Sequence, residues 1–365
     1  MISRRDMLKT GACAAAALAL PRTADAQAVA FAPKPGNWRD FEVVTRLELP
    51  ANGKAQAWIP LPSMREDQWI KPAKSGWETN ALSAEIVRDP KYGSELLHLV
   101  FKDGETAPRV ELRSGFSLRD RAENLATKPT VPALGEADRK LYLEATELMP
   151  TDGIVRETAE KAAAGKTGDL DRARAIYEWV VTNTFRDAKT RGCGTGDVAS
   201  MLRTGNLSGK CADLNALYVA LVRSVGIPAR DIYGIRVAAS KFGYKSLGTG
   251  SDVITKAQHC RAEIWLDGYG WVAADPADVR KVVLEEPPGN NTVDDPKVVA
   301  ARQALFGAWE GNWLGYNAAH DLVLPGSNHK VGFLMYPQAE VAGALLDCLD
   351  PDTFKYVIRS TELTA

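Results

Sequence analysis

Between residues 137 and 226 the hydrophobic positions repeat with the period of an α-helix. Apolar side chains recur three and four positions apart, which places them on one face of a helix. Gly226 and Pro228 favour the end of the last helix, because glycine readily adopts the left-handed cap and proline cannot continue the hydrogen bonding. The pattern predicts helices over residues 137–148, 153–164, 169–184 and 197–203, and a longer one that starts at Cys211.

Apolar and polar positions alternate, as in β-strands, on both sides of the helical region. Before it, strands are predicted over residues 41–49, 56–62, 96–101 and 109–112. After it, strands are predicted over residues 230–237, 258–266 and 271–275. We expect the first group to form an antiparallel β-sandwich and the second to form an antiparallel sheet that carries the helices. Helices followed by such a sheet predict an α+β fold.

The pattern divides the chain into four regions. Residues 1–26 are not expected to belong to the fold, and residues 27–135 form a β-rich N-terminal domain that ends in a polar linker, from about Arg121 to Glu136. The α+β domain covers residues 136–285 and contains a Gly/Ser/Lys-rich segment, 239–255, that is expected to be a surface loop. Residues 286–365 are expected to form a C-terminal extension that packs on this core, with a helix near residues 296–306.

The first 26 residues have the features of an export signal. Arg4 and Arg5 precede a short Ala-rich apolar stretch, residues 10–20, and Ala24-Asp25-Ala26 is a small-residue cleavage site. The segment resembles a bacterial twin-arginine (Tat-type) signal. We therefore expect cleavage after Ala26 and a periplasmic or secreted protein. The apolar stretch is too short to span a bilayer, and no later apolar run is long enough.

Composition and charge narrow the range of partners. Of the 365 residues, 45% are hydrophobic and 25% are charged, as in an ordinary globular protein. The 45 Lys and Arg residues nearly match the 46 Asp and Glu residues and form no basic stripe, so no nucleic acid partner is expected. The Gly-rich segment 191–196 fits neither phosphate-binding motif, and no cofactor is expected.

Cys211 lies at the N-terminal end of the apolar stripe of its helix. Unpaired backbone N–H groups there carry partial positive charge, which favours a thiolate and therefore a nucleophile. The structural alternative is a small buried cysteine at the start of a core helix. Four cysteines follow the signal segment, Cys193, Cys211, Cys260 and Cys348, and they can form at most one disulfide if Cys211 stays reduced.

Two further side chains complete a candidate catalytic set. In the strand 258–266, His259 and Cys260 point to opposite faces, and Cys260 shares its face with Ala262 and other apolar residues, which predicts a core thiol. Asp275 ends the next strand. Cysteine-dependent amide cleavage needs a thiol, an imidazole that deprotonates it and a carboxylate that orients the imidazole. Cys211, His259 and Asp275 supply these three groups.

Five motifs follow one another within residues 177–279. They are Gly196-Asp197, Gly209-Lys210-Cys211, RSVGIPAR at 223–230, HCRAEIW at 259–265 and GWVAADP at 270–276. With these motifs the segment resembles the transglutaminase-like superfamily, which has a papain-like α+β fold. The resemblance implies that Cys211 is the nucleophile, His259 its base and Asp275 the carboxylate that orients the base. It also implies a peptide or protein amide as the substrate. It does not name the oxyanion hole; we expect the backbone N–H of Cys211 to be one donor, and the second donor is unassigned.

Ala212 departs from the family pattern, because the animal cross-linking enzymes have Trp after the nucleophile. The sequence also has no acidic loop suited to Ca²⁺. We therefore expect hydrolysis of peptide, isopeptide or glutamine-type amides through a thioester, rather than cross-linking. Two alternatives stay open. One is a non-catalytic periplasmic peptide-binding module on the same fold. The other is metal binding by Cys211, His259 and Asp275, which no second close Cys/His pair supports.

The candidate triad also predicts the geometry of a hairpin. His259 and Asp275 are 16 positions apart on consecutive strands, so they share a face only if paired positions add up to an even number. A two-residue turn centred on Gly268-Tyr269 gives an odd sum. We therefore expect a three-residue loop, Asp267-Gly268-Tyr269, or a bulge, with Arg261 opposite Asp275. Should this fail, Glu263 is the first alternative acid on the His259 face.

Overall fold

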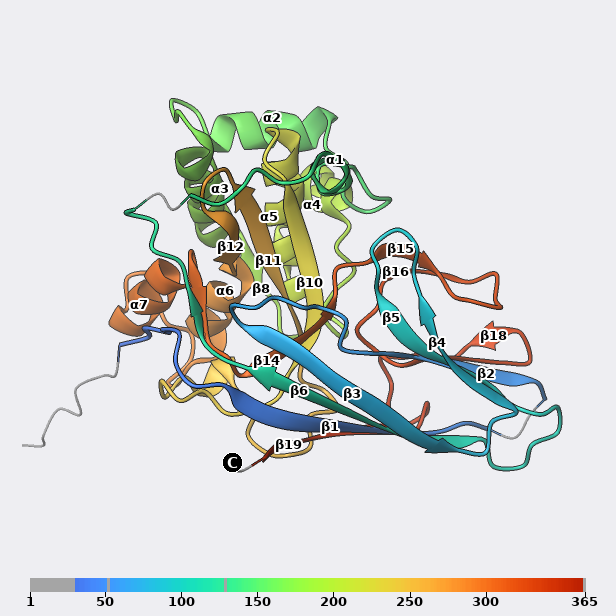
Figure 1. Ribbon diagram of the computed structural model, residues 1–365. Helices are drawn as coiled ribbons and strands as arrows, with labels where there is room; N and C mark the ends of the chain where they lie inside the picture. The colour runs from blue at the N-terminus through green and yellow to red at the C-terminus, as the bar shows by residue number, and fades with distance from the viewer. Residues whose placement is uncertain (1–29, 51–52, 128–129, 364–365) are drawn as a thin grey trace, which may run out of the picture.

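The computed structural model describes residues 30–50, 53–127 and 130–363 (Figure 1). It confirms the α+β fold, because helices gather on one antiparallel sheet and two further antiparallel sheets build a β-rich N-terminal region. The expected signal segment, residues 1–26, lies outside the described residues. Within the described part of the chain, no helix combines the length and the apolar content that a bilayer crossing requires.

The N-terminal region consists of two sheets that share one core. Phe41 and Leu112 come from one sheet, Ala57 and Leu99 from the other, and all four belong to the same buried cluster. The predicted alternation places these side chains between the two sheets. The first sheet, in the order β19-β1-β6-β3, contains β1 (Arg39–Glu48), β3 (Ile70–Thr79), β6 (Arg109–Leu118) and β19 (Tyr356–Leu363). The second, in the order β18-β17-β2-β5-β4, contains β2 (Ala55–Pro60), β4 (Ser83–Arg88), β5 (Glu95–Val100), β17 (Gln338–Val341) and β18 (Ala344–Leu345).

The hydrophobic pattern did not predict strands β3 and β4. Each is the edge strand of its sheet. None of the residues of β4 is buried, and β3 buries only Ile70. Edge strands that face solvent on both sides are held by backbone hydrogen bonds to one neighbour, so their sequences need little apolar alternation.

The C-terminal region returns to the N-terminal sheets. β17 pairs antiparallel with β2, and β19 pairs antiparallel with β1 (Figure 1). The two ends of the described chain are therefore joined by backbone hydrogen bonds. On the way, the region forms α7 (Pro296–Ala304), β13 (Ala308–Trp309), β14 (Trp313–Asn317), β15 (His320–Val323) and β16 (Lys330–Phe333).

The third sheet, in the order β12-β11-β10-β14, carries the helices (Figure 1). Helix α5 (Cys211–Ser224) packs on two of its strands, β10 (Ala229–Arg236) and β11 (Gln258–Leu266), and also contacts α2 and α3. All residues of α5 are buried, so it is the central element of this half of the molecule. The half also contains α1 (Glu136–Leu141), α2 (Gly153–Ala162), α3 (Asp169–Asn183), α4 (Val198–Thr204), β8 (Phe185–Arg186), β9 (Ser208–Gly209) and β12 (Gly270–Ala274).

Three local predictions are wrong. The helix expected over residues 137–148 is limited to α1, which buries no residue and so lacks the packing that would hold a longer helix. The segment 239–255 is not simply a surface loop, because Tyr244 and Leu247 are buried beside the short 3-10 helix η1 (Lys245–Leu247). Arg121, expected to start a polar linker, is buried in β7 (Arg121–Ala122), which pairs with β13.

The sequence also did not predict the helix that follows Asp275 directly. In α6 (Pro276–Glu285), proline occupies the first turn, and the Asp275 carboxylate accepts a hydrogen bond from the backbone N–H of Asp278 at 3.0 Å. Pro276 ends the strand, as expected. It also begins a helix, because its fixed φ and missing N–H suit the first helical position.

Glu263, on β11, connects the N-terminal sheets to the third sheet. Its carboxylate is fully buried and accepts hydrogen bonds from Arg121 and, at 2.6 Å, from Arg230. Arg230 also reaches Glu66 of the N-terminal region at 2.6 Å. Burial opposes the ionisation of Glu263, but the charges of Arg230 and Arg121 lower the pKa of its carboxyl. Glu263 therefore has a structural role and does not contact His259 in this network.

We expect Glu263→Ala to lower the free energy of unfolding by about 3–5 kcal/mol, because it removes the fully buried carboxylate that two buried guanidinium groups share. Denaturant unfolding measures this value. Glu160→Ala is the matched control, since Glu160 pairs with Arg156 on an exposed helix face, and it should cost only about 0.5 kcal/mol. Equal effects of the two substitutions would contradict the structural role of Glu263.

Candidate active site

The start of helix α5 is fixed by the carboxylate of Asp213. This carboxylate accepts hydrogen bonds from the backbone N–H groups of Lys210, Thr195 and Gly196, each at 2.9 Å. A Cβ at Gly194 would lie 1.8 Å from an oxygen of Asp213, and its φ of +90° also favours glycine. The backbone of the Gly-rich segment that precedes α4 therefore fixes the end of α5 that carries Cys211.

The Cys211 thiol is the first side chain of α5 and is 3% exposed. Burial alone raises the pKa of a thiol. Here hydrogen bonds from Cys193, Cys260 and His259, together with the charge of His259, more than offset burial and hold the pKa of Cys211 well below its usual value. The helix N-terminus acts in the same direction. The site therefore favours a thiolate at neutral pH.

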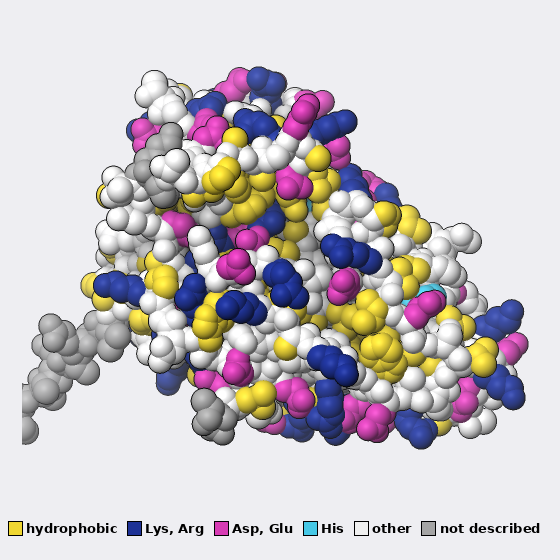
Figure 2. Space-filling model, viewed as in Figure 1, with side chains coloured by type: hydrophobic (Ala, Val, Ile, Leu, Met, Phe, Trp, Pro, Cys, Tyr) yellow, Lys and Arg dark blue, Asp and Glu magenta, His cyan; other side chains and the backbone are white. Residues whose placement is uncertain are grey.

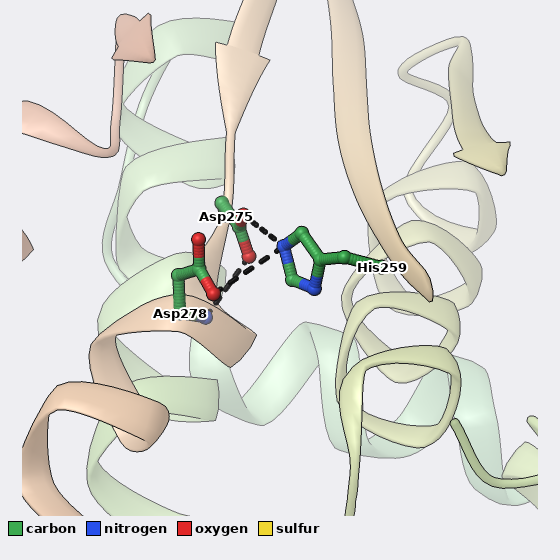
Figure 3. Close-up of side chains that lie close together, drawn as sticks. All are labelled: His259, Asp275 and Asp278. Carbon is green, nitrogen blue, oxygen red and sulfur yellow. Dashed lines mark hydrogen bonds and ion pairs between the residues drawn. The ribbon is translucent and has the colours of Figure 1, made fainter. Parts of the chain in front are cut away.

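His259 lies between the thiol and two carboxylates. Its Nε2 is 2.8 Å from Oδ2 of Asp275 and 3.3 Å from Oδ1 of Asp278 (Figure 3). Because Nε2 faces the carboxylates, Nδ1 is the ring nitrogen left for Cys211. This assignment makes the Nε2–H the donor to Asp275, which orients the ring.

Asp275 is held from several sides and has no exposed surface. Besides His259, it accepts a hydrogen bond from the side chain of Asn215 at 3.2 Å and from the backbone N–H of Asp278. The guanidinium of Arg261 lies 3.5 Å from Oδ2. Burial and the charge of Asp278 raise the pKa of Asp275. The structure thus brings the predicted residues Cys211, His259 and Asp275 together; their catalytic role stays a prediction.

Asp278 is the second carboxylate at His259, and the sequence analysis missed it. Arg236 donates a hydrogen bond to its Oδ1 at 2.5 Å. Despite burial, Arg236 and His259 hold the pKa of Asp278 well below its usual value. Burial disfavours the imidazolium of His259, but Asp278 and then Asp275 overcome it and raise the pKa of His259 to about 9. His259 is therefore protonated at neutral pH, as a partner of a thiolate must be.

The hairpin has the predicted geometry. Ala262 pairs with Ala274 and Leu266 with Gly270, which leaves Asp267-Gly268-Tyr269 as a three-residue loop. The same register, continued by one residue, sets Arg261 opposite Asp275. The prediction from the spacing of His259 and Asp275 is confirmed.

The three remaining cysteines described by the structure are free thiols, as is Cys211. Cys260 is fully buried, as predicted, but face alternation did not anticipate that its thiol helps to lower the pKa of Cys211. The Cys193 thiol also lowers the pKa of Cys211. It donates a hydrogen bond to the carbonyl of Gln258 at 3.3 Å, and the carbonyl of Cys193 accepts the backbone N–H of Ala212 at 2.9 Å. Burial and the neighbouring Cys211 raise the pKa of both Cys193 and Cys260, so both remain protonated donors.

The site offers ligand atoms for a metal ion, but cationic side chains already lie beside those atoms. His259, Asp275 and Asp278 offer three atoms that lie within 4.8 Å of one another. However, Arg236 already binds Oδ1 of Asp278 and Arg261 lies beside Asp275. The set also differs from the alternative considered above, because Asp278 takes the place of Cys211. This charge distribution fits an imidazolium better than a divalent cation.

Two of the missed residues had signals in the sequence. Asn215 is four positions after Cys211 and therefore on the same helix face. Asp278 is the third residue of a helix whose start, Asp-Pro at 275–276, is a typical cap followed by proline. Arg236 and Cys193 come from a strand end and a loop, and no local pattern marks them.

Comparisons with known proteins identify the family of this chain. The sequence model of the transglutaminase-like superfamily matches residues 156–276. The chain belongs to this superfamily. An uncharacterized protein of Haemophilus influenzae is 37% identical over 330 residues, which cover 86% of this chain and 88% of that protein.

Among solved structures, a protein of Cytophaga hutchinsonii, described as a candidate cysteine protease, has the same fold. The two share 14% sequence identity with a TM-score of 0.55, over 90% of this chain and 92% of the other. The periplasmic domain of TgpA from Pseudomonas aeruginosa is similar at 16% identity and a TM-score of 0.33, over 67% of this chain and 88% of that domain.

We expect Asp278→Asn to lower the pKa of His259 from about 9 by about one unit or more, because the substitution removes a buried negative charge next to the ring. Titration of the imidazole by NMR measures it. Asp267→Asn is the control, since Asp267 is 61% exposed in the hairpin loop, and should leave this pKa unchanged. An unchanged pKa in Asp278→Asn would contradict the role of the second carboxylate.

Proposed function

We propose that this protein is a cysteine-dependent hydrolase or acyltransferase that cleaves peptide, isopeptide or glutamine-type amide bonds. The observation that carries the proposal is the geometry: Cys211 starts α5 and lines the same cleft as His259, whose Nε2 lies 2.8 Å from the Asp275 carboxylate. The low pKa of the Cys211 thiol agrees with this arrangement. Membership of the transglutaminase-like superfamily supports it. A cleft of about 490 Å³, lined by both Cys211 and His259, leaves space for an acyl group at the sulfur.

The residues suffice for a two-step acyl transfer. The Cys211 thiolate attacks the amide carbonyl, and His259 donates its proton to the leaving amine, so that a thioester forms and the C–N bond breaks. Water or an amine then attacks the thioester, gives its proton to His259 and releases the thiolate. The backbone N–H of Cys211 makes no hydrogen bond among the described residues and can donate to the oxyanion.

Hydrolysis is favoured over cross-linking. Ala212 follows the nucleophile in place of the Trp of the cross-linking enzymes, and its small side chain is buried. We also propose that the chain is exported through its Tat-type N-terminal segment and acts in the periplasm or outside the cell. The twin arginines and the cleavage site after Ala26 support this location.

Replacement of Cys211 tests the nucleophile. We expect Cys211→Ala to lower the rate of amide hydrolysis by at least roughly a thousandfold while the fold is retained, because the chemistry has no other thiolate. His259→Ala should lose roughly a hundredfold or more, since it removes the proton donor. Turnover of a peptide and isopeptide library, with melting temperature as the check on folding, measures both. Cys348→Ala, a half-buried thiol away from His259, is the control, and wild-type turnover by Cys211→Ala would exclude the covalent mechanism.

The pH dependence of kcat/KM tests the ion pair. We expect kcat/KM to fall as the pH rises through about 9, where His259 loses the proton that the leaving amine needs. On the acid side, kcat/KM should fall only well below the usual pKa of a thiol, because Cys211 stays ionised there. A basic limb centred near 6.5, the ordinary value for histidine, would contradict the proposed charge state.

A further inference from the structure

The cleft at Cys211 is lined by cations and by no carboxylate. Its side chains include Arg186, Lys210, Arg236, Lys256 and Lys281, and no Asp or Glu is among its lining residues. On the face of the molecule shown in Figure 2, by contrast, basic and acidic side chains are interspersed. The separation of charge therefore distinguishes the cleft from the face shown in Figure 2.

Carboxylates near the cleft neutralise only part of the positive charge of these five side chains. Arg236 is paired with Asp278, and Lys256 lies 3.7 Å from Asp352. A single residue, Glu285, serves both Arg186 and Lys281, the latter at 3.9 Å, and Lys210 has no ion pair among the described residues. Three carboxylates thus face five cations. The Cys211 thiolate does not remove the surplus, because its own counter-ion is the protonated His259.

The electrostatic repulsion among these cations is clearest at Lys281. Its side chain is 18% exposed, and its Nζ lies 3.9 Å from Glu285, which is beyond hydrogen-bond distance. Burial and then the neighbouring charge of Arg236 lower the pKa of Lys281 to about 8, and Arg186 acts in the same direction. An anion bound beside Lys281 would relieve this repulsion and supply the missing hydrogen-bond acceptor.

The cations lie on the segments that carry the candidate triad. Arg186 pairs, in β8, with Gly209 of β9, two residues before Cys211. Lys281 belongs to α6, the helix that Asp275 caps. Lys210 is the N-cap of α5 and directly precedes Cys211. A charged group on a substrate held at the sulfur would therefore lie near these side chains.

We propose that the cleft binds an amide substrate with a carboxylate close to the bond that Cys211 attacks, and that Lys281 and Arg186 hold this carboxylate. The inference rests on the proposed function and adds the substrate class, an acidic peptide. The carboxylate can come from a neighbouring acidic side chain or, in an isopeptide, from the free α-carboxylate of a γ-glutamyl acyl group. Both sources present the same chemistry to the two cations.

Two pairs of electrophilic probes test the proposal. In the first pair, peptidyl chloromethyl ketones differ only in Glu against Gln next to the reactive carbon. In the second, γ-glutamyl chloromethyl ketones carry a free or an amidated α-carboxylate. The rate of Cys211 labelling is followed by intact mass, with Cys211→Ala as the blank. We expect the anionic member of at least one pair to label about tenfold faster, and the excess to shrink in high salt.

The variants assign the preference to residues. Lys281→Gln and Arg186→Gln should bring the ratio of anionic to neutral labelling close to one. Lys189→Gln, which removes an exposed charge outside the cleft lining, should retain the wild-type ratio. A melting temperature checks the folding of each variant. Because there are two variants, the assignment can still be tested if one of them does not fold.

The outcomes separate the two proposals. Equal labelling by both members of both pairs would overturn the acidic substrate while leaving the thiol nucleophile intact. A preference that survives in both Lys281→Gln and Arg186→Gln would overturn the assignment to these residues. Failure of every probe to label Cys211 would contradict the proposed function, and this inference with it.

Discussion

A buried charge needs a buried partner of opposite sign, and this rule holds the site together. Asp275 and Asp278 have no exposed surface, and each is next to a guanidinium, Arg261 and Arg236. His259 lies between the carboxylates and completes the balance. The strand ends of β10 and β11 and the start of α6 must therefore meet at one point, because every one of these elements contributes a charge that the others neutralise.

Much of the site follows from local patterns. The helical stripe that begins at Cys211, the alternation around His259 and the spacing to Asp275 predicted which side chains meet, and the hairpin register confirmed the geometry. Asp278 was missed because Pro276 was interpreted only as the end of a strand, although the same residue also starts α6. Arg236 was missed for a different reason. Its role depends on how β10 packs beside α6, and no local pattern in the sequence contains that information.

The strands likewise divide into those that local sequence patterns predict and those that they do not. A strand with one buried face, such as β1, was predicted because burial imposes a period on its sequence. The edge strands β3 and β4 and the short C-terminal strands have no such period. Their places are determined by backbone pairing with distant partners, as for β19 with β1. The partner of such a strand is determined by the complete sheet and not by the sequence of the strand itself. The C-terminal strands therefore could not be predicted from the sequence.

The pairing of β19 with β1 and of β17 with β2 has a consequence for the order of folding. Both N-terminal sheets lack strands until the C-terminal segment has been synthesised, so during translation β1 and β2 present unpaired edges. Contacts of such high sequence separation slow folding and leave early chains open to association through those edges. The sheet of the helical half is completed by β14, which precedes β17 and β19 in the chain, so this half can form first. Completion of the sandwich is then the last step, and it ties the two ends of the polypeptide together.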